Sequence, residues 1–145
     1  MTYREMSVED IESVLQLYID YYNNHEDSCW TQETAYKRIH QVLTMEGAYA
    51  LMLEDGGKAI GFAMGFFQQY DDIVSYVLEE IVVAYEFQGK GVGTSFLAEL
   101  ERRVKAQGVS CVELKAVKDE MHERFYGKAG FHEVKNFVLK VKWFE

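Results

Sequence analysis

The sequence predicts an α/β protein with one mixed, mostly antiparallel sheet flanked by helices. Two observations predict this class. Segments with apolar residues at helical spacing alternate with continuous apolar runs that are typical of buried strands. A turn with glycine at 89, 91 and 93 separates the central strand segment from a helical one. The predicted order is β-α-α-β-β-β-α-β-α-β-β, and we expect a single domain over residues 1–145.

The first predicted elements are a short edge strand over residues 2–6 and two helices. Ser7 is the expected N-cap of the first helix, because Glu9 and Asp10 follow it in the first turn. The second helix is expected over residues 31–45. The apolar stripes that predict the two helices are Ile11, Val14, Leu15, Tyr18 and Tyr22, then Ala35, Ile39, Val42 and Leu43.

The next predicted elements are strands, because the apolar period changes after residue 47. Three strands are expected over residues 48–53, 58–68 and 73–83. A helix should then run from Gly91 to about Gly108. The remaining predictions are a strand over residues 110–117, a short helix over 119–128 and two final strands over 131–144.

The glycine-rich turn predicts an anion site. Glycines at every second position leave backbone N–H groups open to a ligand, and the N-terminus of the following helix adds a positive dipole end. A phosphate or pyrophosphate fits such a turn. A Walker A loop is excluded because Ala84 stands where its first glycine is needed and Gly91 where Ser or Thr is needed. The spacing also fails the dinucleotide fingerprint.

Three motifs in order resemble the GNAT superfamily of N-acetyltransferases. Residues 88–93 (QGKGVG) match its Q/R-x-x-G-x-G signature, residues 78–83 (LEEIVV) resemble its central strand, and residues 125–131 (FYGKAGF) are similar to its F-Y-x-x-x-G-F segment. The resemblance implies the fold of that family and acetyl-CoA as co-substrate, without a metal. Dimers are common in the family, so it also allows a homodimer.

The resemblance implies that the coenzyme binds along the central strand and the glycine loop. The implied coenzyme-binding residues are Ile81, Val82, Val83, Gln88, Gly89, Lys90, Gly91, Val92, Gly93, Thr94, Asp119 and Tyr126. A bulge in the strand should expose backbone groups, with an oxyanion donor near Val82 or Val83. Asp119 departs from the usual asparagine and His122 from a small alanine. An ionised aspartate only accepts hydrogen bonds, so this pantetheine contact differs from the family pattern.

Two residues are predicted to be catalytic, Glu79 and Tyr126. In the polyamine-acetylating members that this strand resembles, the first glutamate of an L-E-[DE] pair is the proposed base, acting directly or through water. Glu79 and Glu80 are adjacent on a strand and should point to opposite faces, which leaves Glu80 to ion pairing or to the cleft. Tyr126 matches the family tyrosine that protonates the departing thiolate; its alternative is a packed aromatic residue.

The acceptor is expected between the first two helices and the middle strands. The predicted pocket residues are Tyr22, Trp30, Phe67 and Glu80. Aromatic rings and carboxylates together suit a cationic amine, although any one of these rings also suits the core. The amine remains open among polyamines, aminoglycosides, amino-acid derivatives and protein amines.

Composition limits the other function classes. The formal net charge of −9 disfavours nucleic acid and favours a small-molecule amine as partner. The chain lacks a signal pattern and a membrane-length apolar run, so we expect a cytoplasmic protein without a membrane partner. Cys29 and Cys111 should be free thiols, with Cys111 small and buried. The alternative function is an acyl-CoA-binding sensor or assembly module of the same fold.

Overall fold

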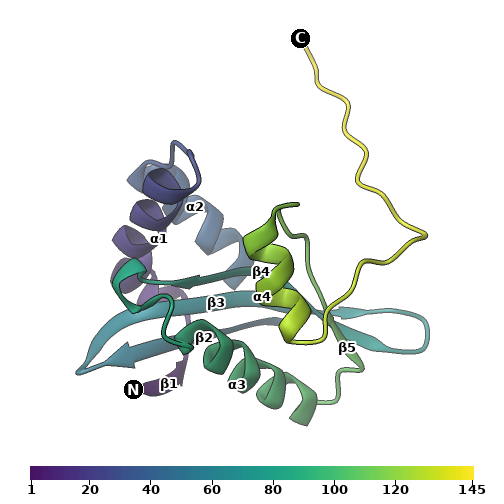
Figure 1. The fold of residues 1–145 in the computed structure, drawn as a ribbon, viewed down its shortest axis with the longest axis horizontal. Helices are drawn as coiled ribbons and strands as arrows, with labels where there is room; N and C mark the ends of the chain where they lie inside the picture. Colours follow the sequence, from purple (N-terminus) through teal and green to yellow (C-terminus); the bar gives the residue numbers. More distant parts are fainter. The chain divides into compact units, whose positions relative to one another are not determined.

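A computed structural model describes all 145 residues and divides them into two compact units. Residues 1–115 form the first unit, which holds a five-stranded sheet and helices α1, α2 and α3 (Figure 1). Residues 116–145 form the second unit, which holds helix α4. The single domain over residues 1–145 stays a prediction.

The sheet has the order β1-β2-β3-β4-β5. Its strands are β1 (Thr2–Glu5), β2 (Ala48–Asp55), β3 (Lys58–Gln69), β4 (Val74–Val83) and β5 (Cys111–Glu113). The first three pairings are antiparallel and β4 pairs with β5 in parallel. The predicted mixed, mostly antiparallel sheet is therefore confirmed.

The chain has six helices, three of which begin with a capping residue, at Ser7, Thr31 or Asp119. They are η1 (Val8–Asp10), α1 (Ile11–His25), α2 (Gln32–Leu43), η2 (Tyr85–Phe87), α3 (Val92–Ala106) and α4 (Glu120–Lys128). The Ser7 N–H donates to Asp10 at 2.9 Å, and the Thr31 hydroxyl accepts from the Thr34 N–H at 3.1 Å. These bonds satisfy backbone and side-chain groups that a helix start would otherwise leave open.

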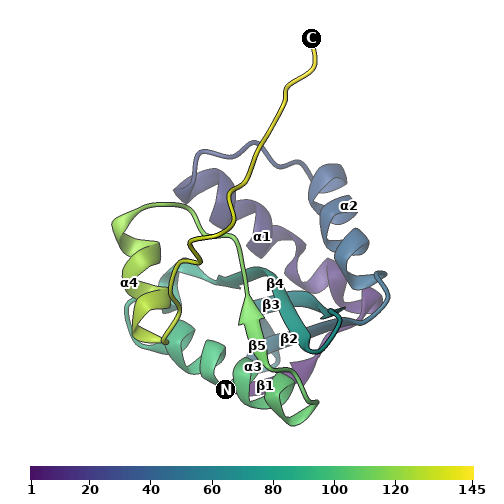
Figure 2. The ribbon, with the colours of Figure 1, turned by 90° about the vertical axis from the view of Figure 1, so that its right-hand side faces the viewer.

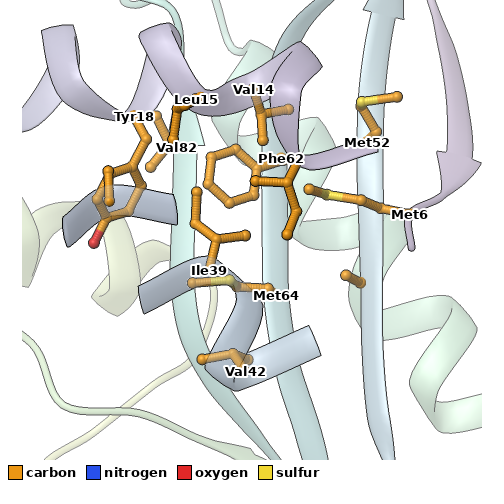
Figure 3. Close-up of a cluster of buried hydrophobic side chains, with 13 residues drawn as sticks. Met6, Val14, Leu15, Tyr18, Ile39, Val42, Met52, Phe62, Met64 and Val82 are labelled. Carbon is orange, nitrogen blue, oxygen red and sulfur yellow. The ribbon is translucent and has the colours of Figure 1, made fainter. Parts of the chain in front are cut away.

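Helices α1 and α2 cover one face of the sheet and α3 covers the other (Figures 1 and 2). The apolar side chains predicted for α1 and α2 form a hydrophobic core on their face of the sheet, where they pack on Phe62 and Met64 of β3 (Figure 3). On the other face, Phe96 of α3 is fully buried and its ring lies 5.7 Å from that of Tyr3. Burial on both faces explains why β3 reads as a continuous apolar run.

A β-bulge interrupts the pairing of β3 with β4. Met64 lies opposite Glu80 and Gly65 lies opposite Leu78, so Glu79 is the extra residue on β4. The strands approach closely here, because a Cβ added to Gly65 would lie 2.1 Å from the Val77 carbonyl oxygen. The bulge therefore depends on glycine at position 65.

Strand β5 is shorter than the predicted strand over residues 110–117. Its parallel pairing covers only Ser75 to Val77 of β4 and stops before the bulge, which bends a strand and breaks its ladder. Because β5 is the edge strand, Cys111 is exposed, and the expected burial of this residue is wrong.

The two strands predicted over residues 131–144 are absent. Residues 131–145 carry neither helix nor strand, and follow α4 as extended chain (Figure 1). Alternating apolar residues form a strand only with a hydrogen-bonded neighbour, and this segment has none. Its large side chains are exposed, with Trp143 88% and Phe144 89% accessible.

Candidate active site

The glycine loop connects β4 to α3 through η2. Gly89 and Gly91 have φ of +74° and +80°, a region in which only glycine is free of strain. A Cβ added at either position would have no heavy atom within 4 Å, so the space beside the loop is open. The glycines are thus required by the backbone path and leave the loop accessible to a ligand.

The N-terminus of α3 presents free donors. Gly91 is its N-cap and offers no side-chain cap, and the first intrahelical bond runs from the Ser95 N–H to the Gly91 carbonyl at 3.0 Å. The N–H groups of Val92, Gly93 and Thr94 therefore precede the helical ladder and point towards the loop. Such an end binds an anion without a side-chain charge.

The strand that leads to this loop has an open edge. After Val77, β4 pairs only with β3, so Leu78 to Val83 have one edge without a ladder partner. Ile81, Val82 and Val83 lie on this stretch, with the side chains of Val82 and Val83 buried. The Gln88 amide donates to the Val83 carbonyl at 2.9 Å and ties the loop to the strand end.

The Glu80 carboxylate is held by three side chains from α1 and α2. Its Oε2 accepts from the Tyr18 hydroxyl at 3.0 Å and from Arg38 Nη2 at 3.2 Å, and its Oε1 accepts from the Tyr22 hydroxyl. The Glu80 side chain is 12% exposed. Four donors, counting Arg38 Nε at 3.3 Å, fill the capacity of this carboxylate.

The charges of this cluster support one another. Burial, and then the Glu80 carboxylate, raise the pKa of Tyr18 and of Tyr22, so both phenols remain proton donors. Burial lowers the pKa of Arg38, but the carboxylates of Glu80 and Glu79 outweigh it and raise that pKa. A buried ion pair of this kind is stable only with such additional hydrogen bonds.

Glu79 shares the face of Glu80. Its Oε1 lies 3.8 Å from Arg38 Nη1, beyond hydrogen-bond distance, and its side chain is 25% exposed. The prediction that the two glutamates point to opposite faces is wrong, because the bulge at Glu79 breaks the alternation and lets Arg38 reach both carboxylates. Glu79 thus keeps free acceptor capacity where Glu80 has none.

The structure separates the predicted acceptor residues. Tyr22 and Trp30 both adjoin Tyr18, with ring centroids 4.8 and 5.2 Å from its own, on the face that carries Glu80. Phe67 lies on the α3 face, where its ring is 5.7 Å from Tyr49 and 5.6 Å from Tyr76. Phe67 is therefore not grouped with the other three residues.

In the second unit, Asp119 is the N-cap of α4. Its Oδ1 accepts from the His122 N–H and lies near His122 Nδ1, both at 2.7 Å. These bonds, the backbone one first, lower the pKa of Asp119. The ring of Tyr126 lies 5.0 Å from Phe125 and 5.6 Å from Phe131. The His122 side chain is 16% exposed, so it is not the solvated histidine that a helix surface suggests.

Sequence reasoning missed two residues of the cluster, Arg38 and Gly65. A signal existed for Arg38, since it lies within the apolar stripe of α2 between Ala35 and Val42, where a charge needs a buried partner. Nothing in the sequence marked Gly65, because its role arises from the close approach of β4.

Other features lie apart from this cluster. A cavity of about 370 Å³ lies between Ser7, Leu43 and Tyr49 and contains no predicted site residue, so the chemistry of the side chains and not the cavity defines the candidate site. No group of three or more His, Cys, Asp or Glu is arranged to hold a metal. None of the helices combines the length and apolarity needed to cross a membrane.

Solved structures share this fold. A ribosomal-protein-alanine N-acetyltransferase from Brucella melitensis biovar Abortus 2308 matches with a TM-score of 0.76 at 16% identity, over 99% of this chain and 100% of its own. A predicted acetyltransferase with acetyl-CoA from Clostridium acetobutylicum matches with a TM-score of 0.77 at 15% identity, over 97% of this chain and 95% of its own. An aminoglycoside N-acetyltransferase, AAC(6')-Iy, in complex with CoA matches with a TM-score of 0.74 at 19% identity, over 97% of this chain and 93% of its own. The fold is thus one that acetyltransferases adopt.

The family assignment comes from the sequence model of the acetyltransferase (GNAT) family, which matches residues 11–131. Because this match covers most of the chain, the protein belongs to the GNAT acetyltransferase family. A search of curated protein sequences finds no significant match. The family is therefore established.

Proposed function

We propose that the protein is an acetyl-CoA-dependent N-acetyltransferase that acts on a primary amine of a small cationic substrate, by direct transfer in a ternary complex. One observation carries the proposal. The free N–H groups that begin α3 are joined through η2 and the glycine loop to a strand that has an open edge around the bulge of Glu79. A phosphate-binding end and a free carboxylate thus stand on one continuous segment.

The residues present fit the coenzyme. The N–H groups of Val92, Gly93 and Thr94 suit its pyrophosphate, and the open space beside Gly89 and Gly91 leaves room for it. Lys90 is exposed and adds a positive charge. Glu79 lies four residues before the end of β4, about 13 Å at the usual strand rise, which an extended pantetheine arm can span.

Acetyl-CoA supplies the acetyl group as a thioester. In the proposed transfer the amine nitrogen bonds to the thioester carbon and the carbon–sulfur bond breaks. Glu79 accepts the proton that the amine loses, directly or through water, because its carboxylate has free capacity. Backbone N–H groups on the open edge of β4 are the proposed oxyanion donors. Tyr126, by the family resemblance, donates the proton that the thiolate takes up.

The acceptor class follows from the charges beside Glu79. Two carboxylates stand beside aromatic rings, which favours an amine that arrives as an ammonium ion. The similar structures differ in their named substrates, a ribosomal protein alanine in one and an aminoglycoside in another, so the fold does not decide the acceptor.

The first experiment measures free thiol released from acetyl-CoA by the purified protein. The panel should hold polyamines, aminoglycosides, amino acids and lysine peptides, with calorimetric titration of CoA in parallel. Release stimulated by one class of amine supports the proposal and names the class. Absence of both release and CoA binding would contradict it.

A second candidate is an acyl-CoA-binding module without turnover. The observation that favours it is Asp119, whose carboxylate Oδ1 is engaged by His122 where the family has an asparagine. CoA binding without release, over the whole panel, is the result expected of such a module.

A further inference from the structure

We propose that Arg38 is a positioning residue that sets the charge of the acceptor subsite, and that this charge reduces the affinity gained from a second cationic group on the acceptor. The inference rests on the proposed function, since it concerns the surroundings of the proposed base, Glu79. It goes further by naming a residue that decides how the subsite discriminates between monoamines and diamines.

Arg38 is fixed in place. Its Nε and Nη2 both donate to Glu80 Oε2, at 3.3 and 3.2 Å, and Glu80 is itself anchored by the hydroxyls of Tyr18 and Tyr22. Arg38 is 29% exposed, so much of its side chain is packed. A guanidinium that donates two N–H groups to one carboxylate oxygen has little freedom to move away when a ligand enters.

The remaining nitrogen of Arg38 faces Glu79. Nη1 lies 3.8 Å from Glu79 Oε1, close enough for attraction and too far for a hydrogen bond. Arg38 therefore fixes the position of the carboxylate electrostatically and leaves its oxygens free to accept from an ammonium ion. The Glu79 side chain is 25% exposed and can receive a ligand.

The charges sum to one negative unit. Glu79 and Glu80 each carry one negative charge, and Arg38 carries one positive charge. One ammonium ion neutralises the cluster. The guanidinium repels every ammonium of the acceptor, so a second ammonium, about 6 Å from the first on a four-carbon chain, gains less than it would beside two unpaired carboxylates. The affinity ratio of a diamine to a monoamine therefore depends on the charge of Arg38.

The test compares two probes of equal length, pentylamine and 1,4-diaminobutane. Their dissociation constants are measured at low ionic strength by following backbone amide NMR shifts of residues 79–83 in the protein without coenzyme. We expect Arg38→Gln to improve the diamine relative to the monoamine by about 3- to 10-fold. Arg38→Lys keeps the charge and should restore the wild-type ratio.

Two controls separate this inference from a merely structural role. Arg4→Gln removes an arginine of β1 that pairs with Asp10 of η1 and Glu54 of β2. This variant should leave the ratio of the two dissociation constants unchanged. Glu80→Gln should weaken both probes, because it makes the cluster neutral. If Arg38→Gln does not fold, affinities in Glu80→Gln equal to those of wild type would overturn the proposal.

The proposal is overturned if the ratio is the same in wild type, Arg38→Gln and Arg38→Lys, or if neither probe shifts the amides of residues 79–83. Its failure is distinguishable from failure of the proposed function. Absence of thiol release with every amine rejects the transferase, whereas the binding ratios test the subsite without turnover.

Discussion

At the scale of the residue, Glu79 and Glu80 show how surroundings give two identical side chains different roles. Glu80 accepts from two phenols and a guanidinium, so its carboxylate is committed to the packing of α1 and α2 on β4. Glu79 accepts no hydrogen bond from Arg38. A base needs free oxygens, and only Glu79 has them.

This division predicts opposite effects of the two glutamine substitutions. Glu79→Gln should lower kcat by about 10²- to 10⁴-fold, the range for loss of a general base, with little change in stability. Glu80→Gln should lower the free energy of unfolding by about 1–3 kcal/mol, because the Arg38 guanidinium loses its partner. Urea unfolding and steady-state thiol release measure the two effects. Equal loss of stability in both variants would contradict the assignment.

Tyr126 is predicted to act as an acid. Tyr126→Phe removes the hydroxyl and keeps the ring that packs beside Phe125 and Phe131, so turnover should fall by about 10- to 10⁴-fold while CoA affinity stays near that of wild type. Tyr36→Phe on α2 is the matched control. Unchanged turnover in Tyr126→Phe would assign this tyrosine to packing.

At the scale of the element, the bulge in β4 places the candidate base. It exists because Gly65 lets the Val77 carbonyl approach to a distance that no Cβ allows. The bulge turns Glu79 to the face of Glu80, and β5 pairs with β4 only before it. One glycine on β3 thus supports both the position of the candidate base and the open strand edge.

Gly65→Ala should therefore cost about 1–3 kcal/mol of stability through overpacking, and should impair turnover more than the loss of stability explains. Thermal unfolding and kcat/KM at a temperature where the variant is folded check both parts. Gly127→Ala is the control, since a Cβ there meets no atom within 4 Å. Full activity in a folded Gly65→Ala protein would show that the bulge is dispensable.

The start of α3 gives a second prediction at this scale. Gly91→Val should weaken CoA binding by at least about 10-fold, because the side chain strains the left-handed residue and fills the space beside the free N–H groups. Gly57→Val in the turn between β2 and β3 has the same open surroundings and a φ of +82°, so it controls for strain. Calorimetric titration with CoA compares the two variants. Equal CoA affinities of Gly91→Val and Gly57→Val would reject the loop as the coenzyme site.

At the scale of the whole molecule, acid stability depends on carboxylates with lowered pKa values. The guanidiniums of Arg102 and Arg103 lower the pKa of Glu99 to about 2, from an ordinary value of 4.5. Since the folded pKa is the lower one, this stabilisation is complete above pH 4.5 and is lost as the pH falls through about 2.

The difference in Tm between wild type and Glu99→Gln should therefore be constant above pH 4.5 and shrink from there towards pH 2. Calorimetric scans across this range measure it. Glu12→Gln, which removes a carboxylate without an arginine partner, should show no such trend. A difference that grows on acidification would contradict the sign of the linkage.

Much of the fold could be predicted from the sequence, since local patterns carry it. The apolar stripes of α1 and α2, the start of α2 at Thr31 and the turn before α3 agree with the predictions, and the predicted N-cap Ser7 begins η1, which leads into α1. The family motifs at residues 88–93 predicted the same helix start. These features need only residues close in the chain, so periodicity and glycine positions reveal them.

The errors concern strands that need distant partners. The strand predicted over residues 110–117 keeps only Cys111–Glu113, and none forms over residues 131–144, because apolar alternation does not supply a neighbouring backbone. The face of Glu79 was wrong for a related reason. Alternation holds along a regular strand, and the bulge arises from pairing with Gly65.

The sequence by itself determined the order of the elements as far as α4, the glycine loop and the family, because those follow from residue types at fixed spacing. Tertiary structure alone decided that Glu79 and Glu80 share a face, that Arg38 lies between them and that Phe67 lies elsewhere. The physical reason is that charge pairing acts through space, between residues that are 41 and 42 positions apart in the chain for Arg38 and the two glutamates.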